Sequence, residues 1–80
     1  MIELRKYPRH KVFKAATIGF NRAAGISCTV RNISDGGACL EVVSPLGIPS
    51  DFELHIASDH TVRLCHVVWK TERRIGVSFH

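Results

Sequence analysis

Apolar and polar residues alternate along several short stretches of this chain. Between positions 52 and 56, apolar residues occupy every second position, and polar residues occupy the positions between them; the apolar set is Phe52, Leu54 and Ile56, and the polar set is Glu53 and His55. A period of two places one set on each face of an extended strand, whereas a helix repeats its apolar residues every three or four positions. Helical spacing is nearly absent from the sequence, which therefore predicts an all-β protein.

Six strands are expected from this pattern and from the turn-forming residues between them. They cover residues 11–20, 27–33, 38–43, 52–57, 61–71 and 75–79. Each is rich in β-branched or aromatic residues and is bounded by residues that favour turns. The segment 44–50 contains two prolines, which lack the N–H that a central strand needs. Six short strands predict an antiparallel barrel, closed or nearly closed, because closure removes exposed sheet edges.

The bulk composition is that of one small folded domain. The chain has 80 residues, of which 45% are hydrophobic, and this proportion argues against intrinsic disorder. No apolar run approaches the roughly 20 residues of a membrane span, and no signal-peptide pattern opens the chain. We therefore expect a cytoplasmic protein without membrane insertion, in which residues 1–10 form an N-terminal arm and residues 11–80 form the barrel.

The positive charge is concentrated near the N-terminus. Residues 1–14 hold five of the 11 basic side chains and one acidic side chain, whereas residues 15–80 hold six of each kind. The whole formal net charge of +4 is therefore assigned to the N-terminal arm. A short basic segment on an electrically balanced body suits a compact anion better than a long polyanion, although a solvated tail has the same composition.

The cysteines and histidines show no pattern of a disulfide framework or a metal site. Cys28, Cys39 and Cys65 are odd in number and have apolar or β-forming neighbours, which favours buried free thiols. The five histidines form no H-x-x-x-H pair and no C-x-x-C occurs, so neither a metal nor a cofactor is expected. No constellation of catalytic residues stands out either, and we expect a binding protein rather than an enzyme.

Two arginines, Arg5 and Arg9, stand four positions apart in the basic arm. A guanidinium group can hydrogen-bond the O6 and N7 edge of guanine, stack on the base, and pair with phosphate. In an extended segment this spacing places both side chains on one side, about 13 Å apart, and a bend at Pro8 would bring them closer. The spacing alone is weak evidence, because any basic tail can contain it.

A second pattern, N-x-S-x-x-G, is formed by Asn32, Ser34 and Gly37 at the expected turn between the second and third strands. The Asn32 amide offers a donor and an acceptor to a base edge, and the Ser34 hydroxyl can donate to a phosphate or a base. Gly36 and Gly37 accept positive φ and leave room for close approach. An ordinary hairpin turn favours the same residue types, so this motif alone does not decide between the two interpretations.

In this order, the two motifs resemble the signature of the PilZ domain family, whose members bind cyclic di-GMP. The resemblance covers essentially the whole chain and extends to residues 67–69 and 76–79, which are similar to the family's closing strands. It implies a six-stranded PilZ-type β-barrel. Leu4 precedes the first arginine, where the family often has a further arginine, and this leaves the number of bound nucleotides open.

The resemblance also implies roles for the motif residues. Arg5 and Arg9 would grip guanine and phosphate, Asn32 and Ser34 would contact the nucleotide, and Gly37 would permit the turn. Weaker candidates for contact with the ligand are Lys6, Arg31, Gly36, Arg63 and Trp69. Trp69 has a core position as its alternative role, and the four phenylalanines are expected in the core.

The functional hypothesis is a cyclic di-GMP receptor that orders its arm when the ligand binds and signals to an unidentified protein partner. Motility, exopolysaccharide synthesis and biofilm control are the processes that the resemblance implies. One alternative is a small basic barrel that binds single-stranded RNA, which the scarcity of exposed aromatic residues makes unfavourable. Another is a PilZ-like protein-interaction module that does not bind nucleotides.

Overall fold

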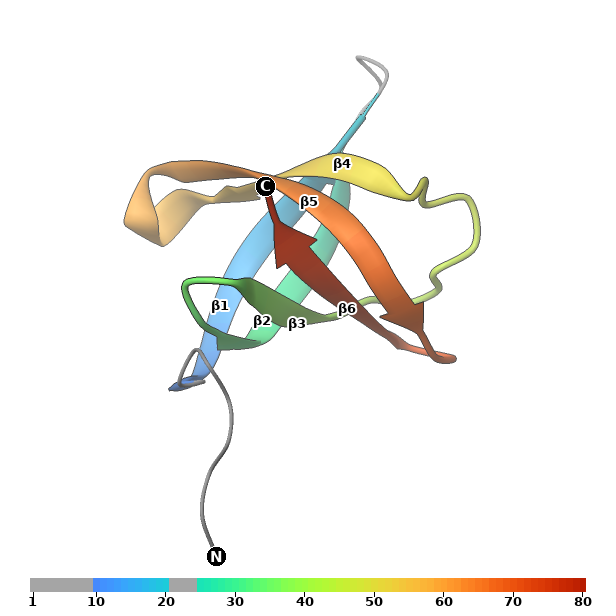
Figure 1. Ribbon diagram of the computed structural model, residues 1–80, viewed down its shortest axis with the longest axis horizontal. Helices are drawn as coiled ribbons and strands as arrows, with labels where there is room; N and C mark the ends of the chain where they lie inside the picture. Colours follow the sequence, from blue (N-terminus) through green and yellow to red (C-terminus); the bar gives the residue numbers. More distant parts are fainter. Residues whose placement is uncertain (1–9, 21–24) are drawn as a thin grey trace, which may run out of the picture.

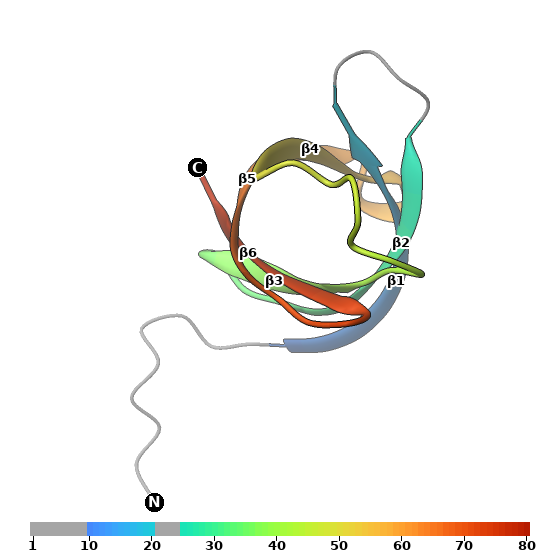
Figure 2. The same ribbon diagram turned by 90° about the vertical axis from the view of Figure 1, so that its right-hand side faces the viewer.

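The computed structural model of the protein describes residues 10–20 and 25–80. Its strands are β1 (His10–Gly19), β2 (Ile26–Ile33), β3 (Gly37–Glu41), β4 (Asp51–Ile56), β5 (Thr61–Lys70) and β6 (Arg74–Phe79), with a short 3₁₀ helix η1 (Ala57–Asp59) between β4 and β5. Every pair of neighbouring strands is antiparallel, and the order β1-β2-β3-β6-β5-β4 closes when β4 pairs with β1. Figure 2 shows the closed ring. The predicted six-stranded antiparallel barrel is confirmed.

The strands begin and end within two residues of the positions that the alternation predicts. The largest difference is at β3, which ends at Glu41 rather than at Val43. Val42 leaves the sheet, although its N–H still donates to the carbonyl of Arg73 over 2.8 Å, and Val43 is 92% exposed. The helix η1 was not predicted. It ends at Asp59 and is followed by His60, whose φ of 51° reverses the chain into β5.

The core lies inside the ring and is formed by the inward-facing residues of all six strands. Its most deeply buried members are Ile18, Val30, Leu40, Leu54, Ile56, Cys65 and Ile75. The segment from residue 42 to residue 50 crosses one end of the barrel (Figure 2) and contributes Val42 and Ile48, each 4% exposed, to the same core. The Lys70 ammonium holds this segment by donating to the Ile48 carbonyl over 2.8 Å.

All three cysteines are buried free thiols, as the sequence predicts. Burial raises the pKa of the Cys28 thiol and of the Cys65 thiol to about 11, because an apolar environment disfavours the thiolate. These two side chains are therefore part of the packed interior and are protonated at neutral pH.

Two expectations about side chains in β1 are wrong. Phe13 was expected in the core but is 76% exposed, because the alternation of β1 turns Val12 inward and Phe13 outward. Lys11 and Lys14 were counted with the arm but belong to β1, and the Lys14 ammonium lies 2.8 Å from the Asp59 carboxylate. Part of the N-terminal charge excess is therefore fixed on the barrel wall.

Within residues 10–20 and 25–80, no helix has the length and hydrophobicity needed to cross a membrane.

Candidate functional site

The turn between β2 and β3 is held together by Ser34. The Ser34 N–H donates to the Gly37 carbonyl over 2.8 Å, and the Ser34 hydroxyl donates to the same carbonyl over 3.3 Å. The hydroxyl oxygen also accepts a hydrogen bond from the Gly36 N–H over 3.3 Å. The hydroxyl predicted to donate to a ligand thus directs its hydrogen into the turn, and its oxygen retains one lone pair for a further donor.

Gly37 acts in this turn through close packing rather than through positive φ. Within the described residues, positive φ occurs only at His60 and Gly47, so Gly36 and Gly37 do not use the positive φ that glycine accepts. A Cβ atom added at Gly37 would instead overlap the backbone carbonyl of Val77 in β6. The Phe79 N–H donates to the Gly36 carbonyl over 2.9 Å. The turn is therefore clamped against the end of β6.

Asn32 reaches its position through an irregularity in β2. It pairs with Lys11 of β1 and with Cys39 of β3, and the register with β3 shifts between Val30 and Asn32. Arg31 is the extra residue at this bulge, a feature that redirects side chains in antiparallel sheets. The half-buried Asn32 thus lies two residues before Ser34 at the base of the turn.

Arg31, a weaker candidate for ligand contact, has other partners in the structure. Its guanidinium donates to the Glu41 carboxylate over 3.2 Å and lies 5.2 Å from the centre of the Phe13 ring. Glu41 in turn lies 3.9 Å from Arg74 of β6. These contacts direct the Arg31 side chain to the acidic group at the end of β3, and the structure does not bring it together with Ser34.

A hollow of about 330 Å³ opens beside the turn and is lined by His10, Ile33, Ser34, Asp35 and Arg63. The Arg63 guanidinium lies 4.1 Å from the centre of the Phe79 ring and donates to the Asp35 carbonyl over 3.4 Å. These contacts hold a cation at the edge of the hollow. The structure therefore brings Arg63 together with Ser34.

His10 is the residue that the sequence analysis missed. It is the first residue of β1 and pairs with Ile33, the last residue of β2, so the register carries it to the edge of the hollow. Its position next to Arg9 in the sequence was the available signal, but only the register with β2 shows that this neighbour reaches the turn. Figure 1 shows the start of β1 and the β2–β3 turn at the same end of the barrel.

Arg5, Lys6 and Arg9 lie outside the described residues. The covalent chain nevertheless limits their reach, because consecutive Cα atoms are about 3.8 Å apart. Arg9 directly precedes His10, and Arg5 can be no more than about 18 Å from it along an extended chain. Both arginines of the first motif are therefore tethered to the edge of the hollow that contains Ser34.

Trp69 lies on the outer face of the barrel in the same row as Asn32, but it does not line this hollow. Asn32, Cys39, Gly76 and Trp69 pair in succession across β2, β3, β6 and β5 and form one row. Gly76 stands between the core residues of β6, and a Cβ atom added there would overlap the Trp69 indole. The indole thus covers β6 and remains 40% exposed. Three strand spacings, about 14 Å, separate Trp69 from Asn32 along this row.

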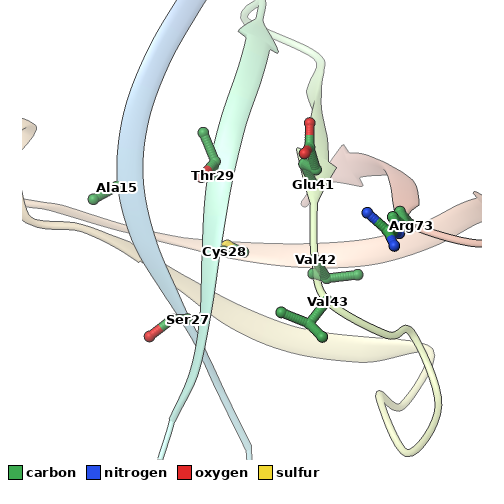
Figure 3. A pocket seen from close by; sticks show the side chains of 8 residues that line it. All are labelled: Ala15, Ser27, Cys28, Thr29, Glu41, Val42, Val43 and Arg73. Atoms are coloured by element: carbon green, nitrogen blue, oxygen red, sulfur yellow. The ribbon is translucent and has the colours of Figure 1, made fainter.

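A second, larger hollow of about 500 Å³ lies on β1, β2 and the end of β3 (Figure 3). Its lining side chains are Ala15, Ser27, Cys28, Thr29, Glu41, Val42, Val43 and Arg73. It contains no residue of either motif, and Glu41 is already paired with Arg31. The candidate functional site is the smaller hollow, because Ser34 of the second motif and His10, to which the first motif is attached, both line it.

Comparison with known proteins identifies the family. The family model described as PilZ domain matches residues 3–80, which include both motifs. The chain belongs to the PilZ domain family. This confirms the resemblance seen in the motifs. PilZ domains are binding modules, typically receptors for cyclic di-GMP, and they often interact with protein partners.

The fold of this PilZ domain is similar to that of the inhibitor of motility MotI/DgrA of Bacillus subtilis. The TM-score is 0.61 and the sequence identity is 16%, over 98% of this chain and 43% of that chain. The PilZ domain described here therefore spans less than half the length of that protein, and the likeness concerns the fold alone. No curated protein matches the chain.

Proposed function

We propose that this PilZ domain binds cyclic di-GMP between its N-terminal arginines and the β2–β3 turn. The observation that carries the proposal is the pairing of His10 with Ile33, because it attaches the arm at the edge of the hollow that contains Ser34. This attachment supports the inference that the two motifs, which are 23 positions apart in the sequence, contact one small ligand.

The polar groups at the hollow suit two parts of the ligand, the phosphate and the guanine. Arg5, Arg9 and Arg63 supply forked cationic donors, which form short, strong hydrogen bonds to phosphate or to the O6 and N7 edge of guanine. The Asp35 carboxylate at the same edge repels phosphate but can accept a hydrogen bond from the amino group of guanine. A ligand that carries both groups fits this division better than inorganic phosphate does.

The signalling step that we propose is ordering of the arm, followed by recognition by a protein partner in the cytoplasm. Bridging the arginines to the turn would fix residues 1–9 against the barrel and reshape that face. The outer side of β5 offers a surface for the partner, because Val62, Leu64 and Val68 are all more than half exposed. Motility, exopolysaccharide synthesis and biofilm control are the processes that such an effector would serve.

Ordering of the arm is tested by amide hydrogen exchange with and without cyclic di-GMP. We expect slower exchange in residues 2–9 when the ligand is bound. Equal exchange rates in both states would contradict ordering of the arm, although the ligand could still bind the barrel.

Binding is tested by calorimetric titration with cyclic di-GMP, GTP and a short single-stranded RNA. We expect cyclic di-GMP to bind most tightly, and Arg9→Ala to weaken binding by about 1.5–3 kcal/mol through loss of hydrogen bonds to a charged group. The matched control is Arg73→Ala, which removes the same charge at the other hollow and should leave affinity nearly unchanged.

The alternative functions give different results in this titration. Binding to RNA alone would favour the nucleic-acid interpretation, which the exposed Phe13 ring makes somewhat stronger than the sequence implied. Absence of binding to all three ligands would favour a protein-interaction module that does not use nucleotides. Equal losses in Arg9→Ala and Arg73→Ala would show that net charge, rather than the proposed site, determines affinity.

A further inference from the structure

Three potential metal ligands converge on the outer face of the barrel, where β4, β5 and β6 lie side by side. Asp51, the first residue of β4, is paired directly with His66 of β5. His66 is paired on its other side with Ser78 of β6, and His80 follows Ser78 by two positions. Because side chains two residues apart in an extended chain share a face, Asp51, His66 and His80 lie on the same side of the sheet.

The atoms of these side chains are already close to a coordination geometry. The Nδ1 atom of His66 lies 3.0 Å from Oδ1 of Asp51, and the Nε2 atom of His80 lies 3.3 Å from the same oxygen. One potential ligand atom from each residue lies within 4.8 Å of the others. Metal–ligand bonds of about 2.0–2.1 Å in a tetrahedron separate neighbouring ligand atoms by about 3.3 Å. Small side-chain rotations therefore suffice to surround one ion.

A backbone hydrogen bond fixes His80, which is the least constrained of the three ligands because it lies outside the strands. His80 lies just beyond β6, and its N–H donates to the Leu64 carbonyl of β5 over 3.0 Å. This hydrogen bond extends the pairing of β5 with β6 and holds the His80 ring 6.1 Å from the His66 ring. Asp51 and His66 thus stand on paired strands, and His80 is attached to β5 by a backbone hydrogen bond, which favours a defined site.

We propose that Asp51, His66 and His80 bind one divalent late transition-metal ion, of which Zn²⁺ and Ni²⁺ are the test cases. Two imidazoles and one carboxylate suit these ions, whereas Mg²⁺ and Ca²⁺ prefer oxygen ligands alone. His66 binds through Nδ1 and His80 through Nε2, and the other ring nitrogen of each keeps its hydrogen. Water completes the coordination, because all three side chains are exposed.

The site is absent from the sequence motifs because its ligands come from β4, from β5 and from the residue that follows β6. Asp51 and His66 are 15 positions apart, and no short spacing of the kind used to recognise zinc sites connects them. Only the pairing of β4 with β5 and of β5 with β6 brings the side chains together. This is why the sequence alone favoured the absence of a metal.

The site adjoins the turn assigned to nucleotide binding but shares no residue with it. Phe79, which precedes His80, donates its N–H to the Gly36 carbonyl. An ion at Asp51, His66 and His80 joins the ends of three strands and therefore stabilises the folded barrel by binding it in preference to the unfolded chain. The inference does not depend on whether cyclic di-GMP binds.

The test is a titration of the chelator-treated 80-residue chain with Zn²⁺ and, separately, with Ni²⁺. We expect one ion per chain and a higher melting temperature with the ion present. His66→Gln and His80→Gln should each weaken the affinity at least about 10-fold, since even residues that only orient a metal ligand contribute 10-fold or more. The matched control is His55→Gln, because His55 and Glu53 form an exposed pair of 3.2 Å and belong to no described group of three ligands.

A spectroscopic measurement on the unmodified protein locates the ion without any substitution. Paramagnetic Ni²⁺ should broaden the NMR signals of residues near Asp51, His66 and His80 and spare those near His55. The proposal is overturned if no ion binds, if His66→Gln and His80→Gln both bind as the unmodified chain does, or if the broadening centres elsewhere.

Discussion

Gly37 allows the turn of the candidate site to pack against β6 because it has no side chain. Any side chain at this position would meet the Val77 carbonyl, which is backbone and cannot rotate away. The Gly37 carbonyl also accepts both hydrogen bonds from Ser34. One residue therefore determines both how closely β3 lies against β6 and how the turn is shaped.

Replacing Gly37 by alanine should destabilise the protein by about 1–3 kcal/mol or more, because overpacking forces the backbone to shift. The measurement is urea-induced unfolding followed by circular dichroism. The control is Gly19→Ala in β1, where the added Cβ would lie 3.4 Å from the His55 ring, and the change should be within about 1 kcal/mol. Similar losses for both variants would show that close packing at β6 is not the reason for the glycine.

Residue identities predict the candidate site only in part. Asn32, Ser34 and Gly37 could be selected because their functional groups and backbone freedom are visible in the sequence. Ser34, however, uses its hydroxyl to shape the turn, and Arg31 turns to Glu41. His10 could not be selected at all, since its place depends on which residue of β2 it faces. The functional group of each residue can be read from the sequence, whereas the residues that it contacts depend on which strands pair.

The segment between β3 and β4 shows that the sequence also predicts the arrangement of whole elements only in part. Its prolines correctly indicate that it is not a strand, and alternation gives the strand ends to within two residues. Neither signal reveals that Ile48 enters the core and covers one end of the barrel. The bulges that shift the register of β1, β2 and β5 are equally invisible, because they arise where the ring must bend to close.

If this segment seals the barrel, Ile48→Ala should destabilise the protein by about 2–5 kcal/mol, as expected when a buried aliphatic side chain is removed. Leu46→Ala is the control from the same segment, because Leu46 is 86% exposed and its loss should change stability by no more than about 0.5 kcal/mol. Thermal and urea unfolding of both variants provides the comparison. Equal stabilities would mean that the segment contributes no packing energy.

At the scale of the whole molecule, the proposed function gives the barrel and the N-terminal arm separate tasks. The six described strands lie within residues 10–79, and the pairing of β4 with β1 closes the ring among these residues. A chain of this length is expected to have a folding free energy of only about 4–12 kcal/mol. Ligand binding can therefore change its thermal stability by a large fraction of the total.

This separation leads to a prediction about thermal unfolding with and without ligand. At a cyclic di-GMP concentration about 100 times Kd, binding should stabilise the folded state by about 2.7 kcal/mol and raise the Tm by about 10–20 °C. In the Arg5→Ala/Arg9→Ala variant the ligand-free Tm should be unchanged and the increase should largely disappear. The Arg73→Ala/Arg74→Ala variant removes the same charge beside β6 and should keep the increase. A lower ligand-free Tm in the first variant would show that the arm also stabilises the barrel, and an undiminished increase would show that the arm does not hold the ligand.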